Sequence, residues 1–241
     1  MSYKRTIFAA SLLFPLACST AAIAADTNGF YGGVGIGQSS FRTGEGTIFS
    51  LVKSSDASAT YPVTYWETKG ARVISNRDTG YQVRLGYRIN DHVSLEGGYS
   101  DLGKMSFSAN QKFVCIVCSF TADGPPIRQV TGNIRATGLD LGIIGKEPLS
   151  DQWSIFGRLG VIVARVKTSA VVTPTNEVLI RATHSNSSPV FGVGMEWTPS
   201  KGEAFIPVIA RLEWTRYKSL GASNTGDSDV DLISMGVNLK F

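Results

Sequence analysis

Alternation of apolar with polar or small residues, repeated along most of the chain, constrains the fold most. The clearest segment places Tyr81, Val83, Leu85, Tyr87 and Ile89 at every second position. Because side chains of a strand point alternately to its two faces, this period of two predicts a β-strand with one apolar face. The pattern recurs near residues 34–36, 93–99, 139–143, 155–163, 191–197, 208–214 and 233–241. We therefore expect an all-β fold of about eight strands, and no segment shows a convincing helical periodicity.

The composition excludes several classes of protein. The chain has 241 residues, of which 17% are charged and 43% hydrophobic, and its mean hydropathy is +0.05. These values are too apolar for a disordered chain. Beyond residue 25, no run approaches the roughly 18 apolar residues that a spanning helix needs. The formal net charge of +4 is spread thinly, so we expect no nucleic-acid partner.

The connections between the expected strands alternate in length. They are short at residues 90–91, 147–152 and 198–203, and long and polar at residues 42–78, 105–134, 168–187 and 219–229. This parity is typical of bacterial outer-membrane barrels, whose tilted strands need about 9–11 residues to span the bilayer. The sequence therefore predicts an eight-stranded antiparallel up-and-down transmembrane β-barrel over residues 26–241, with short periplasmic turns and four long extracellular loops. A soluble β-sandwich is the competing interpretation.

A second set of residues alternates with the apolar set and carries charge. If the apolar set faces lipid, the lumen receives Arg84, Arg88, Glu96, Asp140, Arg158, Glu196, Arg211 and Glu213. The lumen of an eight-stranded barrel is just wide enough for side chains to fill. Because isolated buried ions are costly, we expect these positive and negative side chains to pair with one another.

Aromatic residues of the apolar set gather at the ends of the strands. Those at short-turn ends are Phe30, Tyr87, Trp153, Trp197 and Phe241, and those near the long loops are Tyr81, Tyr99 and Trp214. Belts of aromatic rings at both interfaces are typical of transmembrane barrels and have no purpose in a soluble fold. The pattern favours the outer membrane, with membrane lipid and lipopolysaccharide as surrounding partners.

The N-terminus has the organisation of a secretory signal peptide. Lys4 and Arg5 precede an apolar stretch and then a segment of small residues, which predicts a cleaved signal peptide at residues 1–25. Cleavage removes two of the 23 basic residues and none of the 19 acidic ones, so the formal charge falls to +2. Lipidation at Cys18 is the alternative, although Leu16 stands one place too close to that cysteine.

Cys115 and Cys118 have the spacing C-x-x-C. In an exported chain without a flanking helical pattern, this spacing predicts a small loop disulfide. Free thiols and a redox motif are the alternatives. A zinc site would need two further ligands, and no second pair of Cys or His lies near in the sequence. We therefore expect neither a metal nor a cofactor.

Several segments together carry a family resemblance. They are FYGG at 30–33, LEGGYSDLG at 95–103, FGRLG at 156–160, SPVFGVGMEW at 188–197 and RLEW at 211–214. On these segments the chain resembles the transmembrane domain of the outer-membrane protein A (OmpA-like) family, over residues 29–241. The resemblance implies that the barrel assembly machinery recognises the terminal Phe241. Longer relatives carry a peptidoglycan-binding domain, which we do not expect here.

The family resemblance also implies an interior salt-bridge cluster, which has been treated as a gate. Its charged members fall on Glu96, Glu196, Arg211, Arg158 and Glu213. A lysine of that cluster falls where this chain has Ile144. This departure favours a static network over a gate that exchanges partners, unless Arg84 or Arg158 substitutes for the lysine.

Three functions remain open at this point. The leading interpretation is a structural or surface-interaction barrel whose loops bind host surfaces, phage or neighbouring molecules. A small low-conductance pore is one alternative, and a lipid A-modifying enzyme is the other. The lipid A deacylase type uses a His and a Ser two positions apart, whereas His184 and Ser185 are adjacent and His92 has no Ser and carboxylate around it. We therefore predict no catalytic residue and expect no enzyme.

Overall fold

The computed structural model describes residues 29–55, 64–115, 125–173, 175–199 and 208–241. Within these ranges it contains nine strands and one helix. They are β1 (Gly29–Arg42), α1 (Glu45–Ser55), β2 (Thr64–Ser75), β3 (Arg77–Arg88), β4 (Val93–Cys115), β5 (Ile127–Pro148), β6 (Trp153–Thr173), β7 (Glu177–Trp197), β8 (Val208–Leu220) and β9 (Ser228–Lys240). The signal peptide expected at residues 1–25 lies outside the described residues, and so does Cys18.

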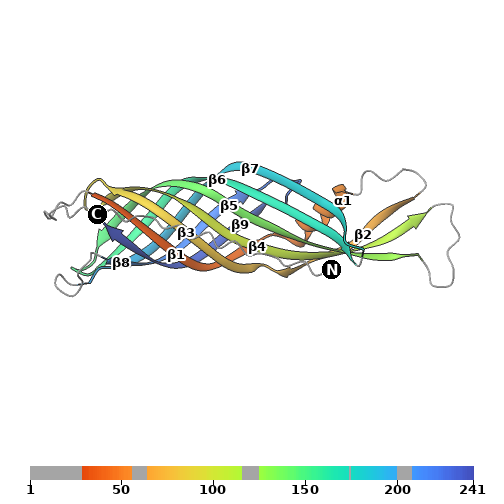
Figure 1. Cartoon of the computed structure of the whole chain (residues 1–241), viewed down its shortest axis with the longest axis horizontal. Helices are drawn as coiled ribbons and strands as arrows, with labels where there is room; N and C mark the ends of the chain where they lie inside the picture. The colour runs from red at the N-terminus through yellow and green to blue at the C-terminus, as the bar shows by residue number, and fades with distance from the viewer. Residues whose placement is uncertain (1–28, 56–63, 116–124, 174, 200–207) are drawn as a thin grey trace, which may run out of the picture.

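Eight of the strands close into a barrel (Figure 1). Neighbours follow the order β4-β3-β1-β9-β8-β7-β6-β5, and β5 pairs with β4 to complete the ring. All pairings are antiparallel, including Tyr31 opposite Lys240, where the first and last strands meet, and Val93 opposite Gly145 at the closing seam. Closure satisfies the backbone of both edges, which hydrocarbon requires. The predicted eight-stranded antiparallel barrel is confirmed.

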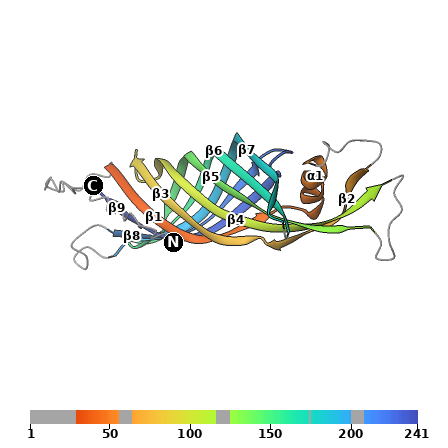
Figure 2. The same ribbon diagram turned by 45° about the vertical axis from the view of Figure 1, so that its right-hand side comes forward.

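The ninth strand, β2, lies outside the ring. It pairs with the far part of β4, from Ser75 opposite Ser106 to Thr64 opposite Cys115. Figure 2 shows β2 and α1 together at the end of the molecule away from the C-terminus. The chain between β1 and β3, expected as one long loop, therefore holds a helix and a strand.

The helix α1 contradicts the expectation that no segment is helical. Its apolar residues Ile48, Leu51 and Val52 follow the spacing of one helix face and are buried. With 11 residues, α1 is too short to give a strong periodic signal in the sequence. No helix in the described part of the chain is long and apolar enough to cross a membrane.

The strands β4 to β7 are much longer than a bilayer requires. They have 23, 22, 21 and 21 residues, against the expected span of about 9–11. Residues 105–115, 127–134, 168–173 and 177–187, expected as loop, are strand instead. The sequence predicted loops there because most outward side chains of these segments are polar, with many Ser and Thr, and only a few, such as Ile127 and Val178, are apolar.

The outward face of each barrel strand changes character at one level. On β6 the outward side chains are Leu159, Val161 and Val163, followed without a break in the alternation by Arg165 and Lys167. On the other barrel strands, the last apolar and the first polar outward residues are Ile36/Gln38 on β1, Tyr81/Thr79 on β3, Tyr99/Asp101 on β4, Leu139/Thr137 on β5, Pro189/Ser187 on β7, Trp214/Arg216 on β8 and Ile233/Asp231 on β9. An apolar outward face suits hydrocarbon and a polar one suits water, so this level marks one edge of the membrane.

The inward face changes from polar to apolar at about the same level, which is the opposite of the change on the outward face. On β6 it turns from Arg158 to Ile162, Ala164 and Val166. We call the part beyond this level the extension: residues 104–115, 127–137, 165–173 and 177–187, with α1 and β2. Its interior is a hydrophobic core that includes Met105, Phe107, Val130 and Ile134, and the outer ends of β1, β8 and β9 add Phe41, Leu220 and Leu232 to it. The extension is thus built like a water-soluble β-protein on top of the membrane barrel.

Two segments cover the end of the lumen at the extension. The α1 residues Ile48 and Val52 are fully buried in the core and α1 contacts β2, β4 and β7. The connection between β8 and β9 also turns inward, since Thr225 is fully buried and its carbonyl accepts a hydrogen bond of 2.6 Å from Thr168 Oγ1. The barrel is therefore packed with side chains at this end.

Candidate functional site

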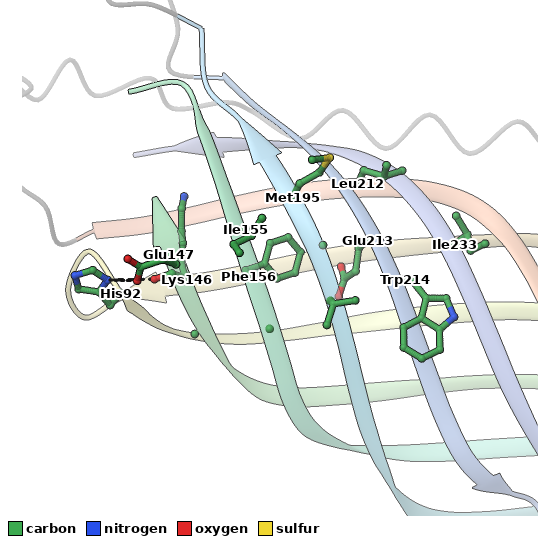
Figure 3. Close-up of a pocket in the computed structure, with 14 residues that line it drawn as sticks. His92, Lys146, Glu147, Ile155, Phe156, Met195, Leu212, Glu213, Trp214 and Ile233 are labelled. Carbon is green, nitrogen blue, oxygen red and sulfur yellow. Dashed lines mark hydrogen bonds and ion pairs between the residues drawn. The ribbon is translucent and has the colours of Figure 1, made fainter. Parts of the chain in front are cut away.

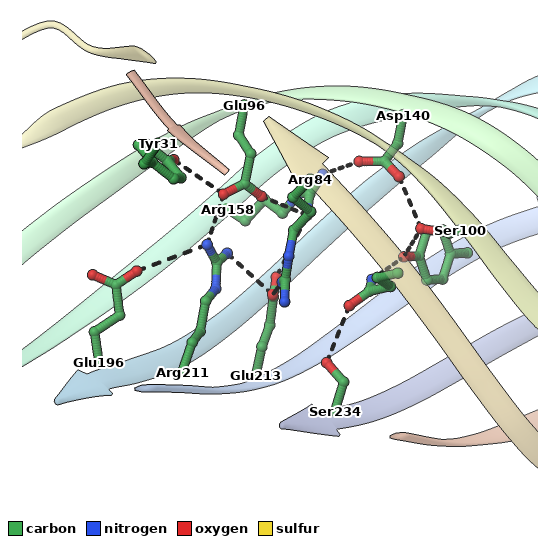
Figure 4. A network of polar contacts seen from close by, with 12 residues as sticks. Tyr31, Arg84, Glu96, Ser100, Asp140, Arg158, Glu196, Arg211, Glu213 and Ser234 are labelled. Atoms are coloured by element: carbon green, nitrogen blue, oxygen red, sulfur yellow. Dashed lines mark hydrogen bonds and ion pairs between the residues drawn. The ribbon is translucent and has the colours of Figure 1, made fainter. Parts of the chain in front are cut away.

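The lumen at membrane level holds a cluster of charged side chains (Figure 4). It consists of Arg84 on β3, Glu96 on β4, Asp140 and Lys146 on β5, Arg158 on β6, Glu196 on β7, and Arg211 and Glu213 on β8. Figure 4 labels all of these except Lys146. We call this set the lumen network. Each member occupies an inward position of its strand, and the antiparallel ring brings strands far apart in sequence to one level. The network contains four cations and four anions, so its formal charge is zero.

Glu96 lies at the centre of the lumen network. Its Oε1 is 3.1 Å from Arg158 Nη1, and its Oε2 is 2.7 Å from Arg211 Nη1. Tyr31 donates a hydrogen bond of 3.0 Å to the same Oε2. Glu96 is fully buried, so two guanidinium groups and a phenol replace the water that its carboxylate loses on folding.

Glu213 is the second junction of the lumen network. Its Oε2 lies 2.6 Å from Arg84 Nη1 and 3.0 Å from Arg211 Nη2. Arg158 approaches Glu213 Oε1 at 3.7 Å and also donates to the carboxylate of Asp140. The three arginines thus share four carboxylates, and no single pair is isolated from the rest.

Lys146 is the member that sequence reasoning missed. Its Nζ lies 2.6 Å from Glu196 Oε2, while Arg211 is 3.8 Å from the other oxygen of that carboxylate. Ile144, where the family pattern has a lysine, is buried and faces inward. The cation expected at 144 is supplied one inward position further along β5, so that partner is present. The alternation through Asp140 and Ile144 could have placed Lys146 inward, but its contact with Glu196 on another strand could not be read from the sequence.

Arg88 was expected in the lumen network but lies outside it. It is half-buried at the short-turn end of β3, opposite Ser94. Among the described residues it forms no ion pair. The alternation correctly predicted that Arg88 faces the lumen. However, Arg88 stands two inward positions beyond Arg84 toward the short turn, past the level at which the carboxylates lie.

Glycines make room for Arg84 inside the narrow barrel. A Cβ added at Gly35 would lie 2.8 Å from Arg84 Nη2, and one added at Gly236 would lie 2.9 Å from the same atom. At Gly98 it would lie 3.2 Å from Arg84 Cγ. The inward glycines of β1, β4 and β9 therefore leave the volume that the guanidinium group fills.

A layer of neutral polar groups separates the lumen network from the hydrophobic core. Ser234 Oγ donates to Gln82 Oε1 at 3.2 Å, and Gln82 Nε2 donates to Tyr217 OH at 2.9 Å. Tyr217 OH lies 3.2 Å from Ser100 Oγ, which donates to Asp140 at 2.9 Å. This chain of hydrogen bonds joins β9, β3, β8, β4 and β5 across the lumen (Figure 4).

The predicted aromatic belts lie on the outer surface at the two limits of the apolar band. At the short-turn end, Phe30 packs against Tyr87 and Trp153 lies next to Trp197, with ring centroids 4.9 and 6.4 Å apart. Phe241 is exposed at the same end, and its backbone N–H donates to the carbonyl of Phe30. At the other limit Tyr81 and Tyr99 are exposed, and Trp214 is half-buried.

The pocket in Figure 3 is an apolar groove on the barrel wall. Its lining includes the outward residues Ile155, Met195, Leu212, Trp214 and Ile233, with Gly145 and Gly157 between them. A Cβ added at either glycine would meet nothing within 4 Å, so these positions open the groove toward lipid. The groove belongs to the lipid-facing band.

Neither histidine is part of a nucleophile–base arrangement within the described ranges. His92 Nδ1 lies 3.2 Å from the carbonyl of Lys146 and 3.5 Å from Glu147 Oε2 at a short turn. His184 and Ser185 lie in β7 rather than in a loop, and they point to opposite faces of the strand. The described residues contain no group of three His, Cys, Asp or Glu side chains that could hold a metal ion.

Cys115 ends β4 and is disulfide-bonded. Cys118, its expected partner, lies outside the described residues. The pairing of the two therefore remains a prediction from the sequence.

A closed antiparallel barrel with an apolar outer band, aromatic belts and a charged lumen defines an integral β-barrel protein of the bacterial outer membrane. A model of the OmpA-like transmembrane domain family matches residues 25–241, and the chain belongs to this family. The family resemblance and the outer-membrane location predicted from the sequence are confirmed. The short-turn end is periplasmic and the extension is extracellular.

Similar proteins include the outer membrane protein A of Escherichia fergusonii, 31% identical over 160 residues, and that of Shigella dysenteriae, 30% identical. Each alignment covers 65% of this chain, and the chain spans about 38% of the length of these relatives. Similar solved structures include Ail of Yersinia pestis, with a TM-score of 0.43, 12% identity and coverage of 88% of this chain and 98% of that one. The N-terminal barrel domain of Pseudomonas aeruginosa OprF has a TM-score of 0.41 and 11% identity, and covers 88% of this chain and 98% of that one.

Proposed function

We propose that this protein is a sealed structural barrel whose extension serves as an interaction surface outside the cell. The observation that carries the proposal is the change of polarity on both faces of the strands at one level. A barrel that only spanned the membrane would end near that level. This chain instead continues β4 to β7 into water and gives them a hydrophobic core.

The packing of the lumen supports the sealed state. The lumen network lies at the periplasmic side, the layer from Ser234 to Asp140 comes next, and the core with α1 closes the outer end. A permeating ion would have to cross all three of these layers. A neutral network of buried, mutually paired charges offers no free charge to attract a permeant ion.

The extension supports the interaction role because its outer part presents hydrogen-bonded strands beyond the lipid. At about 3.3 Å per residue, the stretch Lys104–Cys115 reaches at most roughly 40 Å beyond the membrane edge. Its outward positions are polar, and β2 widens the sheet on the same side. Binding residues carried on such a scaffold are held in place at lower entropic cost than on free loops.

Two measurements test this proposal. The intact chain and a variant lacking β2 (Thr64–Ser75) are produced in a bacterial strain that does not adhere to cultured epithelial cells. We expect adherence with the intact chain and its loss in the variant, while both retain heat-modifiable mobility on gels. Equal adherence of both strains would contradict the interaction role. In planar bilayers we expect no channel activity, and steady conductance of the intact chain would contradict the sealed barrel.

A low-conductance pore is the second candidate, because some buried polar atoms line the lumen without satisfied hydrogen bonds. Within the described residues, the Nε atoms of Arg84, Arg158 and Arg211 have no hydrogen-bond partner. In a pore closed by the lumen network, Arg211→Ala or Glu196→Ala would open the lumen and raise conductance. Conductance unchanged by either substitution would count against a pore.

Catalysis is not part of the proposal. The positions of His92 and His184 provide no base within reach of a nucleophile. Mass spectrometry of lipid A from cells with and without the protein tests this directly. We expect identical lipid A profiles, and a new lipid A species would require an enzymatic role.

A further inference from the structure

A row of basic side chains crosses the outward face of the extension. Lys104 on β4 stands directly opposite Arg135 on β5, which stands directly opposite Lys167 on β6. Arg165 lies one outward position closer to the membrane on β6, and Arg181 on β7 lies opposite Ser169, further out. All five side chains are exposed. We call these five residues the basic row.

Two carboxylates beside the basic row offset only part of its five positive charges. Asp101 and Asp78 both raise the pKa of Arg135, and Asp78 accepts a hydrogen bond of 2.8 Å from the backbone N–H of Lys104. Asp101 pairs with Arg135 at 2.5 Å, but in the described part of the chain Lys104, Arg165, Lys167 and Arg181 form no ion pair. Like charges directly opposite each other on neighbouring strands destabilise a sheet. Three consecutive strands of one sheet therefore carry repelling charges, and Asp101, which pairs with the middle one alone, offsets this repulsion only in part.

On the opposite side of the barrel at the same level, two carboxylates offset most of the charge of three basic side chains. Arg42 and Arg216 pair with Asp231 at 2.5 and 2.6 Å, and Lys218 pairs with Asp229 at 2.8 Å. Hydrogen bonds from Arg216 hold the pKa of the Asp231 carboxyl below its usual value, so this carboxylate is charged at neutral pH. The excess of positive charge is thus larger on the β4–β7 side, where ion pairing among the described residues reaches only Arg135 of the five basic residues.

The basic row stands at the depth of lipid headgroups. Tyr99, Leu139 and Val163 form the last outward apolar row across the same three strands. Arg165 is the next outward residue after Val163, roughly 7 Å along the strand, and Lys167 is as far again. Because barrel strands are tilted by about 35–45°, Arg165 stands roughly 5 Å and Lys167 roughly 10 Å above Val163, at the inner part and the outer limit of the headgroup layer. The polar layer of a bilayer begins at the edge of its hydrocarbon core and is about 5–8 Å thick on each side.

We propose that the basic row binds the phosphate groups of a lipid A-type glycolipid in the outer leaflet, with acyl chains lying on Tyr99, Leu139 and Val163. Arginine donates paired hydrogen bonds to phosphate, and lysine supplies a compact charge. The site is continuous with the apolar band, which favours a membrane lipid over a soluble polyanion. This inference goes beyond the proposed function, since it concerns a membrane lipid bound at the base of the extension rather than a partner outside the cell.

The test uses the full barrel in phosphatidylcholine nanodiscs that contain lipid A with or without its phosphates. Binding is measured by native mass spectrometry for the wild type and two charge-matched variants. The site variant is Lys104→Gln/Arg165→Gln/Lys167→Gln, and the control is Arg42→Gln/Arg216→Gln/Lys218→Gln. Heat-modifiable gel mobility verifies that each variant has folded before binding is compared.

We expect the wild type and the control to prefer phosphorylated lipid A, and the site variant to bind it roughly 100-fold more weakly, as the loss of three basic residues at an anionic surface implies. Equal weakening in both variants would overturn the site, because it would reflect net charge alone. Equal binding of phosphorylated and dephosphorylated lipid A would overturn phosphate recognition. Competition by soluble pyrophosphate at the same concentration as lipid A would overturn the assignment to a membrane lipid.

Discussion

The Nζ atom of Lys146 lies 2.6 Å from Oε2 of Glu196, and this contact completes the lumen network. The two residues are 50 positions apart and stand on β5 and β7, with β6 between them. Glu196 has Arg211 only at 3.8 Å as a further cation. Neutrality of the network therefore depends on a lysine that lies near the periplasmic end of the lumen.

The substitution Lys146→Met should destabilise the barrel by about 1–3 kcal/mol, because it leaves the buried carboxylate of Glu196 without its nearest cation. The measurement is urea unfolding in lipid vesicles, followed by tryptophan fluorescence. Arg88→Met is the matched control, since Arg88 lies outside the network, and its effect should stay within about 0.5 kcal/mol. A larger loss of stability in Arg88→Met than in Lys146→Met would mean that Arg88, rather than Lys146, belongs to the lumen network.

The substitution Gly35→Ala should destabilise the barrel by about 1–3 kcal/mol. The new Cβ would lie 2.8 Å from Arg84 Nη2, so Arg84 must move away from Glu213 and leave that carboxylate less well satisfied. The same unfolding measurement applies. Gly145→Ala, which meets nothing within 4 Å on the lipid side, should be close to neutral. Equal stability of the two variants would show that Arg84 is not confined by β1.

The substitution Leu159→Arg should cost about 2–4 kcal/mol in folding into lipid vesicles, because it places a charge in the middle of the apolar band. Ser169→Arg, five outward positions further along the same strand and above the membrane edge, should cost less than about 1 kcal/mol, which reflects repulsion from Arg181 directly opposite. Similar costs at both positions would mean that the change of polarity between Val163 and Arg165 does not mark the edge of the membrane.

The substitution Leu51→Asp should open the outer end of the extension while leaving the membrane barrel intact. A buried, unpaired carboxylate in the core is costly, and α1 is short enough to detach on its own. We expect faster cleavage by proteinase K added to whole cells, with unchanged heat-modifiable mobility. Lys53→Ala, on the exposed side of α1, should be cleaved like the wild type. Protection of the Leu51→Asp variant would show that α1 does not depend on the core.

The period of two predicted the barrel well because it is a local property. The side chain two positions along a strand returns to the same face whatever the rest of the chain does, so Arg84, Glu96 and Glu213 could be placed inward from sequence alone. The same pattern was misinterpreted in the extension, where loops were predicted in place of strands. There the alternation continues, but polar side chains point outward and apolar ones inward, and polar outward residues read as loop.

The sequence by itself determined the strand faces, the apolar band and the inward position of the charges, since each follows from alternation along one strand. Only the tertiary structure decided that Lys146 rather than Arg88 joins the lumen network, that α1 fills the outer end of the lumen, and that Lys104, Arg135 and Lys167 form one row. These relations join residues on different strands. They depend on the register and tilt with which the strands pair, and no spacing within a single strand contains that information.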